Sequence, residues 1–186
     1  MPFSHAYADN SQYQGYIKVA VKTSKGFRTV AFIARDDYKS IEQLQTFDHC
    51  DYYISANTYK TRRANKDNIL GYNNIVIDID CHDDKTSVYE RTEALEAFLF
   101  RYEQYKLPKP TIIHRTGRGL QLWYHVQQAS ARLAFMFDAV RECFINACNK
   151  IIQDYPTECG MLHPDRNASS GLYRMFGTTN TKTSTK

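Results

Sequence analysis

The sequence has few of the features that mark a secreted or membrane-spanning protein. Its five cysteines are odd in number and form no Cys-x-x-Cys pair, so no disulfide framework is expected. The amino-terminal residues are polar and rich in tyrosine, not basic and then apolar, and the longest apolar run is far shorter than the ~20 residues of a membrane helix. These absences predict a cytoplasmic protein with reduced thiols and no membrane partner.

The sequence also lacks a recognisable zinc pattern. Cys159-x-x-x-His163 lies downstream of Cys143 and Cys148, but the latter two are five residues apart in a predicted helix and do not share a face. The spacing matches no common zinc module, so zinc is not expected. No His-x-His pair occurs, which argues against a rolling-circle initiator.

The bulk composition is that of a globular protein. Of 186 residues, 42% are hydrophobic and 24% are charged, which is enough for one well-filled core and predicts a single domain over residues 1–186. The net charge of +4 is compatible with nucleic-acid binding without requiring it. The polar tail TKTSTK fits a frayed terminus and a domain cut from a longer chain equally well.

Hydrophobic periodicity predicts a mixture of strands and helices. Strand-like segments are 27–34, 52–55, 75–80, 111–126 with a glycine turn at 116–119, and 171–176. Helical patterns occupy 40–47, the stretch from Ser87 to the stop at Leu107-Pro108, and 131–154. In the last of these, Leu133, Phe137, Val140, Phe144, Ala147 and Ile151 are expected to form one apolar face. The fold class is therefore α+β, or mixed α/β, with a largely antiparallel sheet backed by helices.

The most strand-like segment, IVIDID, carries two carboxylates. Because side chains alternate along a strand, Asp78 and Asp80 share a face with Val76 and His82, while the isoleucines between them take the other face. The two carboxylates lie ~6.5 Å apart and repel each other unless a cation sits between them, and hard divalent ions prefer such ligands. The alternative is a strand end that simply meets solvent.

Two other segments offer groups suited to phosphate. The turn Thr116-Gly-Arg-Gly119 supplies glycine amides and Arg118, with Gln121 on the strand that follows; a plain surface hairpin is the alternative. Near the C-terminus, Asp165 precedes a strand with Arg174, and Lys182 follows in a polar turn. A buried arginine there needs a carboxylate or phosphate partner, and an ordinary structural ion pair would satisfy it.

In their order and spacing, these clusters resemble the archaeo-eukaryotic primase superfamily, the primase-polymerases, in particular the replication-protein branch of plasmids, phages and mobile genetic islands. The motifs stand here as IVIDID, as TGRGLQLW, and as Asp165 followed by YRMFGTTNTK, over residues 57–182. Two positions depart from the family pattern. Gln121 stands where the family usually has a phosphate-binding histidine, and Phe176 stands where it usually has proline.

The resemblance implies a sheet like that of the RNA-recognition fold, with a smaller αβ lobe beside it. It implies that Asp78, Asp80 and Asp165 hold two Mg²⁺ or Mn²⁺ ions, with Asp154 or Glu158 as alternatives to Asp165. Triphosphate would be bound by Arg118, Gln121 and Lys182, while Arg174 orients an acid or a phosphate. The expected substrates are nucleoside triphosphates and a single-stranded DNA template, with a helicase domain or protein as a partner in replication. The polar, basic loop with Lys60, Arg62, Arg63 and Lys66 is a candidate for contacting template phosphates, and a loop that is simply solvated is the alternative.

Two other functions use the same residues differently. A metal-dependent nuclease would need the carboxylates but not a triphosphate site. A non-catalytic RNA-recognition-type module would stack bases on sheet aromatics such as Trp123 and Tyr124.

Overall fold

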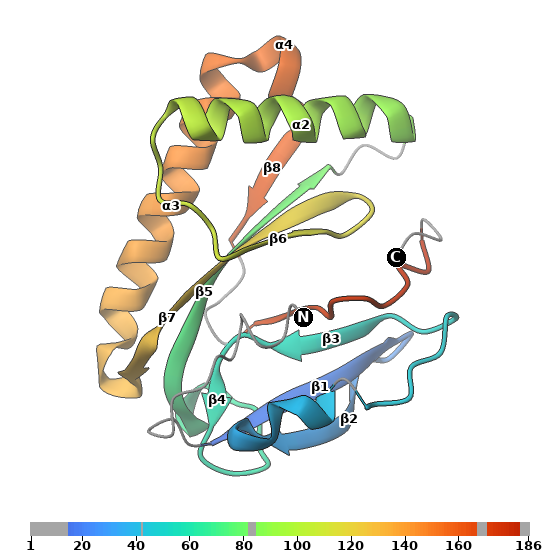
Figure 1. Cartoon of the computed structure of the whole chain (residues 1–186), viewed down its shortest axis with the longest axis vertical. Helices are drawn as coiled ribbons and strands as arrows, with labels where there is room; N and C mark the ends of the chain where they lie inside the picture. The colour runs from blue at the N-terminus through green and yellow to red at the C-terminus, as the bar shows by residue number, and fades with distance from the viewer. Residues whose placement is uncertain (1–14, 42, 82–84, 167–170, 183–186) are drawn as a thin grey trace.

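The computed structural model describes residues 15–41, 43–81, 85–166 and 171–182 (Figure 1). The strands are β1 Tyr16–Thr23, β2 Gly26–Ala34, β3 Tyr52–Ser55, β4 Thr58–Tyr59, β5 Ile69–Cys81, β6 Ile112–Arg115, β7 Gly119–Ser130, β8 Leu162–Asp165 and β9 Leu172–Arg174. The α-helices are α2 Val88–Gln104, α3 Ala134–Asp154 and α4 Pro156–Cys159, and short 3₁₀ helices span Arg35–Ile41, Lys66–Asn68 and Ala131–Leu133. The fold is α+β with one large antiparallel sheet. No helix in the described ranges is long and apolar enough to cross a membrane.

One half of the molecule, here called the helix-backed half, is a continuous β-α-β-β-α-β unit. Its strands lie side by side in the order β8-β5-β7-β6, and every neighbouring pair is antiparallel. Helices α2 and α3 cover one face, where the isoleucines of β5 and the leucines of β7 pack (Figure 1). The capping box expected at Ser87 is present, with its hydroxyl accepting from the Glu90 amide.

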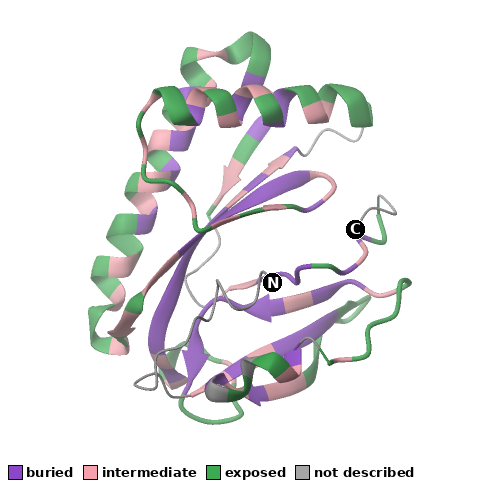
Figure 2. Cartoon of the chain, viewed as in Figure 1, coloured by how far each residue is buried: buried purple, intermediate pink, exposed green. Residues whose placement is uncertain are grey.

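The other half, here called the hairpin half, is the smaller part of the same sheet. The β1–β2 hairpin lies beside β3, which pairs with β9, while β4 connects β1 to the lower end of β5. Its core includes Val76 and Trp123 from the helix-backed half, so the two halves share buried side chains. Figure 2 shows buried residues both on the long strands β5 and β7 and on the strands of the hairpin half. Strand β5 runs through both halves and places its last residues where they meet.

Several expected elements are confirmed and others are wrong. Strands are present at 52–55 and, from one residue earlier than expected, at 26–34. The described residues of 40–47 do not form the expected helix: a 3₁₀ helix ends at Ile41, whose side chain is buried in the core of the hairpin half, and turns and irregular chain occupy 43–47. The described part of the smaller lobe thus has no α-helix. Strands β1, β4 and β8 were not expected, and β5 begins six residues before the predicted start.

The apolar face expected for 131–154 is also partly wrong. Regular helix begins at Ala134, and both Leu133 and Val140 are exposed. The buried face is centred on Ile145, Cys148 and Ile151, which pack against β5 and α2, and it includes the charged side chain of Arg141. The buried face of a helix is the face that contacts its neighbours. Which residues of α3 are buried therefore depends on where β5 and α2 lie, and not on the apolar pattern alone.

Candidate active site

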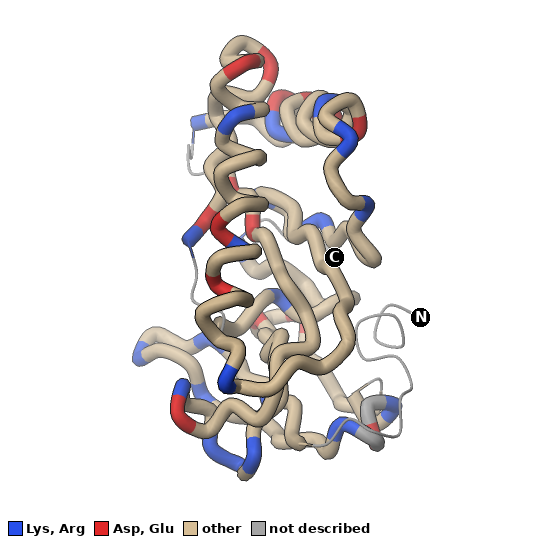
Figure 3. The backbone as a smooth tube through the Cα atoms, turned by 90° about the vertical axis from the view of Figure 1, so that its left-hand side faces the viewer, with Lys and Arg blue, Asp and Glu red and all other residues tan. Residues whose placement is uncertain are grey.

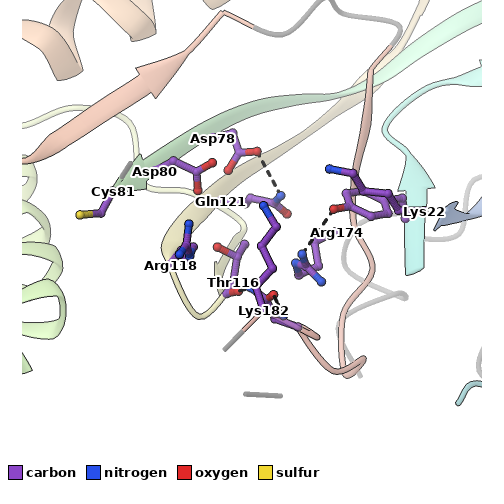
Figure 4. Close-up of a pocket in the computed structure, with 11 residues that line it drawn as sticks. Lys22, Asp78, Asp80, Cys81, Thr116, Arg118, Gln121, Arg174 and Lys182 are labelled. Carbon is purple, nitrogen blue, oxygen red and sulfur yellow. Dashed lines mark hydrogen bonds between the residues drawn. The ribbon is translucent and has the colours of Figure 1, made fainter. Parts of the chain in front are cut away.

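A pocket of about 190 Å³ opens where the two halves meet (Figure 4). Both halves contribute side chains to it, and polar groups dominate. The residues that line it are Lys22, Tyr53, Asp78, Asp80, Cys81, Thr116, Arg118, Gln121, Arg174, Asn180 and Lys182. The predicted acids of β5, the predicted turn and the predicted C-terminal cluster therefore meet in one place.

The acidic residues are brought together by strand register. Asp78 lies opposite Gln121 of β7 on one side and opposite Asp165 of β8 on the other. Directly opposed residues in antiparallel strands project to the same face with Cβ atoms about 5 Å apart. Asp165 therefore adjoins the Asp78–Asp80 pair, although it does not line the pocket itself.

The two alternatives to Asp165 lie elsewhere. Asp154 accepts hydrogen bonds from Tyr105 and Lys150 in the helical layer, and Glu158 forms an ion pair with Arg101 at 2.8 Å. Both carboxylates are thus engaged in the layer of helices. His82, which was expected to share the acidic face, lies outside the described residues.

The close approach of the turn to the acids depends on Gly119. This residue pairs with Asp80, and a Cβ atom placed on it would lie 2.0 Å from the Ile79 carbonyl oxygen and 2.7 Å from Asp80 Oδ1. Any side chain here would collide with the backbone of β5, so only glycine permits this approach. The Cys81 amide then donates to the Arg118 carbonyl at 3.2 Å, which fixes the turn against the end of β5.

Asp78 is in an environment that disfavours its charge. Burial, followed by the negative charges of Asp80 and Asp165, raises its pKa to about 8, although the hydrogen bond from Gln121 and the charge of Arg174 act in the opposite direction. Its Oδ1 atom is buried and has no hydrogen-bond partner among the described residues. An acceptor left in this state is destabilising, and a cation bound there would remove the cost.

The donor set fits a hard divalent cation that retains part of its water shell. Asp78 and Asp80 share a face of β5 at the pocket, with oxygen ligands of the kind that Mg²⁺ and Mn²⁺ prefer. Within the described ranges, no three acidic, histidine or cysteine side chains already enclose a metal position. The carboxylates would therefore hold an ion together with water or phosphate oxygens, as is usual for Mg²⁺.

Gln121 is a buried member of the network under the acids. Its Nε2 donates to Asp78 Oδ2 at 3.4 Å, and its Oε1 accepts from Trp123 Nε1 at 3.4 Å. His114 Nδ1 lies 3.3 Å from the same Oε1, and burial lowers the pKa of His114 to about 4, so its ring is neutral at pH 7. The amide of Gln121 thus orients Asp78, while one edge of the residue faces the pocket.

Arg174 has a carboxylate partner, as its burial requires. It forms an ion pair with Asp51 at 2.8 Å and donates to the Tyr53 hydroxyl at 3.3 Å. Burial alone would raise the pKa of Asp51, but hydrogen bonds from Arg174 and Thr181 and the Arg174 charge bring it below its usual value. Asp51 accepts both the amide and the hydroxyl of Thr181, at 2.9 and 2.8 Å. This acid therefore fixes the segment after β9 onto the hairpin half.

The same segment is also attached to the turn. The Asn180 side-chain amide donates to the Thr116 carbonyl, and the Lys182 amide donates to Asn180 Oδ1 at 3.1 Å. Figure 4 shows Lys182 extending from this segment toward Gln121, with Arg118 on the turn beside Asp80. Arg118 and Lys182 thus share the pocket with the two acids, as do Lys22 and Arg174.

Sequence reasoning missed two pocket residues on the hairpin half. Lys22 of β1 and Tyr53 of β3 both line the pocket, opposite the acids. The alternation in YIKVAVKT, with Ile17, Val19 and Val21 buried, was a signal that could have identified β1 and the outward direction of Lys22. Tyr53 had no local signal, because its place depends on the pairing of β3 with β9.

Arg141 of α3 is a buried residue that supports the site without lining it. Its Nε donates to the Val76 carbonyl at 3.4 Å, and one terminal nitrogen donates to the Asp165 carbonyl at 3.2 Å. One guanidinium thus links α3 to β5 and to the strand that carries Asp165. An arginine within an apolar helix pattern was the available signal.

The basic loop is exposed but distant from the acids. Lys60, Arg62, Arg63 and Lys66 precede β5, at the bottom of Figure 1, whereas Asp78 and Asp80 are near the other end of that strand. Ile69 and Asp78 are nine residues apart, which is about 30 Å along an extended strand. The loop and the pocket are therefore separate regions of the surface. Only a ligand long enough to span about 30 Å could contact both.

The aromatic residues predicted to stack bases are not available on the sheet. Trp123 is 0% exposed and packs against Tyr173 and Phe176, and Tyr124 is 7% exposed and packs against Phe144. They lie on opposite faces of β7, each within one of the two cores. The prediction that these two side chains stack bases is wrong.

Compared with models of known protein families, with curated proteins and with solved structures, the chain matches none.

Proposed function

We propose that this protein is a primase-polymerase that joins nucleotides from nucleoside triphosphates on a single-stranded DNA template. The observation that carries the proposal is the pocket itself. Asp78 and Asp80 stand there opposite Arg118 and Lys182, so groups suited to divalent cations and to phosphate share one small volume. A triphosphate needs both kinds of group when it reacts.

The order of elements supports the proposal. The β-α-β-β-α-β unit, with strand order β8-β5-β7-β6, is the arrangement expected for a sheet of the RNA-recognition type. The acids lie on its first and last strands, and the turn lies between its middle strands. This matches the order in which a primase-polymerase presents these motifs.

In this proposal, Asp78 and Asp80, with Asp165 beside them, would hold Mg²⁺ or Mn²⁺. When bound, the ions would lower the pKa of the attacking 3′-hydroxyl and neutralise charge on the departing pyrophosphate. Arg118 and Lys182 bind the phosphates, and Gln121 holds Asp78 in place through its amide. Arg174 orients the acid Asp51 and so keeps the Lys182 segment beside the pocket. A helicase domain or protein remains the partner expected from the resemblance.

Synthesis without a primer is the direct test. The protein is incubated with single-stranded DNA, Mn²⁺ or Mg²⁺ and a labelled nucleoside triphosphate, beside the D78A/D80A variant. Short labelled products from the wild type alone are expected. R118A, which keeps the acids, should lower the affinity for triphosphate, because the guanidinium is one of the phosphate ligands. No labelled product, with or without a supplied primer, would reject the proposal.

The nuclease alternative is distinguished by the same reaction. A nuclease would shorten the DNA in the presence of Mn²⁺ without any triphosphate, and R118A would leave that activity intact. Cleavage of this kind, lost in D78A/D80A, would assign the acids to hydrolysis instead.

A further inference from the structure

The tip of the β1–β2 hairpin combines exposed cations with an exposed aromatic ring. Lys22 lies directly opposite Phe27 in the strand register, Lys25 lies in the turn and Arg28 follows Phe27 in β2, and all four side chains are exposed. No acidic residue occurs between positions 16 and 34, so the whole hairpin is basic. These four residues are here called the hairpin tip.

The hairpin tip is continuous with the pocket. The Phe27 ring contacts the Tyr53 ring edge-on, with centroids 4.8 Å apart, and Tyr53 lines the pocket. The guanidinium of Arg174 lies over the Tyr53 ring at 5.3 Å from its centroid. A row of groups thus runs from Arg174 through Tyr53 to Phe27, out of the pocket and onto the surface.

The exposure of Phe27 is not explained by the packing of the hairpin. The ring is 48% exposed although Tyr53 holds one side of it in place. A fixed aromatic face among cations is the arrangement with which proteins bind unpaired bases and the phosphates that join them. The tip contributes no carboxylate that would repel phosphate.

We infer that the hairpin tip binds single-stranded DNA where the strand enters the pocket, with a base stacked on Phe27 and phosphates on Lys25 and Arg28. The inference rests on the proposed function, for which it names the template contact. It places that contact beside the acids, and not at the basic loop about 30 Å along β5. Figure 3 shows Lys and Arg spread over the lower end of the molecule, so charge alone does not choose between these places. The contact between Phe27 and Tyr53 favours the hairpin tip, because it connects the exposed ring of Phe27 to the pocket.

The test measures binding alone, in EDTA and without triphosphate. Fluorescence anisotropy compares a labelled (dT)20 with an abasic strand of the same length, which keeps the phosphates and lacks the bases. F27A should bind (dT)20 about tenfold more weakly and the abasic strand unchanged, because only stacking is lost. F27L, which retains apolar bulk, should behave in the same way. F135A, which removes a ring that is 71% exposed on α3, is the matched control and should have no effect.

The charges are tested separately by K25A/R28A. This variant should bind both strands more weakly, and its dependence of log affinity on log salt should be flatter by about 1.4, at ~0.7 per phosphate contact. R62A/R63A removes two cations from the basic loop and serves as the comparison. A larger loss from R62A/R63A than from K25A/R28A would overturn the inference, as would an F27A affinity within twofold of F135A.

The outcomes separate the inference from the proposed function. Binding that depends on Phe27 in a protein that synthesises nothing would keep the inference and reject the function. Primer synthesis that is lost in D78A/D80A but unaffected by F27A, with unchanged (dT)20 affinity, would support the proposed function and reject the inference. Tighter Phe27-dependent binding of (rU)20 than of (dT)20 would overturn DNA as the ligand.

Discussion

At the scale of single residues, Asp78 is expected to lower the stability of the folded protein when no metal is bound. Its carboxyl is enclosed beside two other acids, and its Oδ1 has no hydrogen-bond partner among the described residues. A site that must bind a cation is unfavourable while the cation is absent, so it is expected to reduce stability. The effect can be measured because it depends on protonation.

Without metal, the contribution of Asp78 to stability should fall as the pH rises from about 4 to about 8. The net decrease is expected above about pH 6.5, because below it the buried neutral His114 contributes in the opposite direction. Folded Asp78, with its pKa raised to about 8, retains a proton that an unfolded aspartate loses near pH 4. The folded state therefore binds more protons in this window, and the stabilisation present at low pH is lost through pH 8. The slope is roughly 1 kcal/mol per pH unit, or a Tm decrease of about 2–4 °C per unit.

The variant D78N identifies the residue responsible. It cannot lose a proton, so in EDTA its Tm should not show the wild-type decrease between pH 6.5 and 8, and it should be higher than that of the wild type at pH 8. Mn²⁺ added at pH 8 should raise the Tm of the wild type but not that of D78N. Parallel pH profiles for the two proteins would show that Asp78 does not carry this effect.

At the scale of elements, the β6–β7 turn illustrates how closely two segments can be placed. Gly119 has no room for a Cβ atom against Ile79, whereas Gly177 in the C-terminal segment has open space but a φ of +70°. G119A should therefore destabilise the protein by about 3 kcal/mol through collision with β5. G177A should cost about 1 kcal/mol through backbone conformation alone.

Urea unfolding of both variants would check this comparison. The G119A protein should also lose affinity for Mn²⁺, because the collision displaces the end of β5 on which Asp80 stands. Equal costs for the two substitutions would mean that the turn has freedom to move away from β5.

The elements also separate what local sequence can predict from what it cannot. The alternation in IVIDID gives the faces of β5 correctly, and the capping box gives the start of α2. Strand β8, with the sequence LHPD, has no strand-like pattern, and it forms because the end of β5 offers an edge. The partner of Arg174 is Asp51, 123 positions away, so the ion pair follows from the topology and not from any motif.

At the scale of the whole molecule, the two halves are joined by a shared core and by hydrogen bonds as well as by the chain itself. Strand β5 runs from its pairing with β4 to the acids, and Val76 and Trp123 lie in the core of the hairpin half. Asp51 and Asn180 add hydrogen bonds that connect the C-terminal segment to the hairpin half and to the turn. A pocket assembled from both halves needs both to be folded.

The protein should therefore unfold in a single transition. Trp123 is the one tryptophan of the chain and is fully buried between the halves, so its fluorescence reports their separation. Circular dichroism at 222 nm reports mainly α2 and α3, which belong to the helix-backed half. Urea titrations followed by the two signals should give the same midpoint, because neither half retains a complete core alone. A fluorescence midpoint well below the dichroism midpoint would mean that the hairpin half detaches first, and that the pocket can open while the helices remain folded.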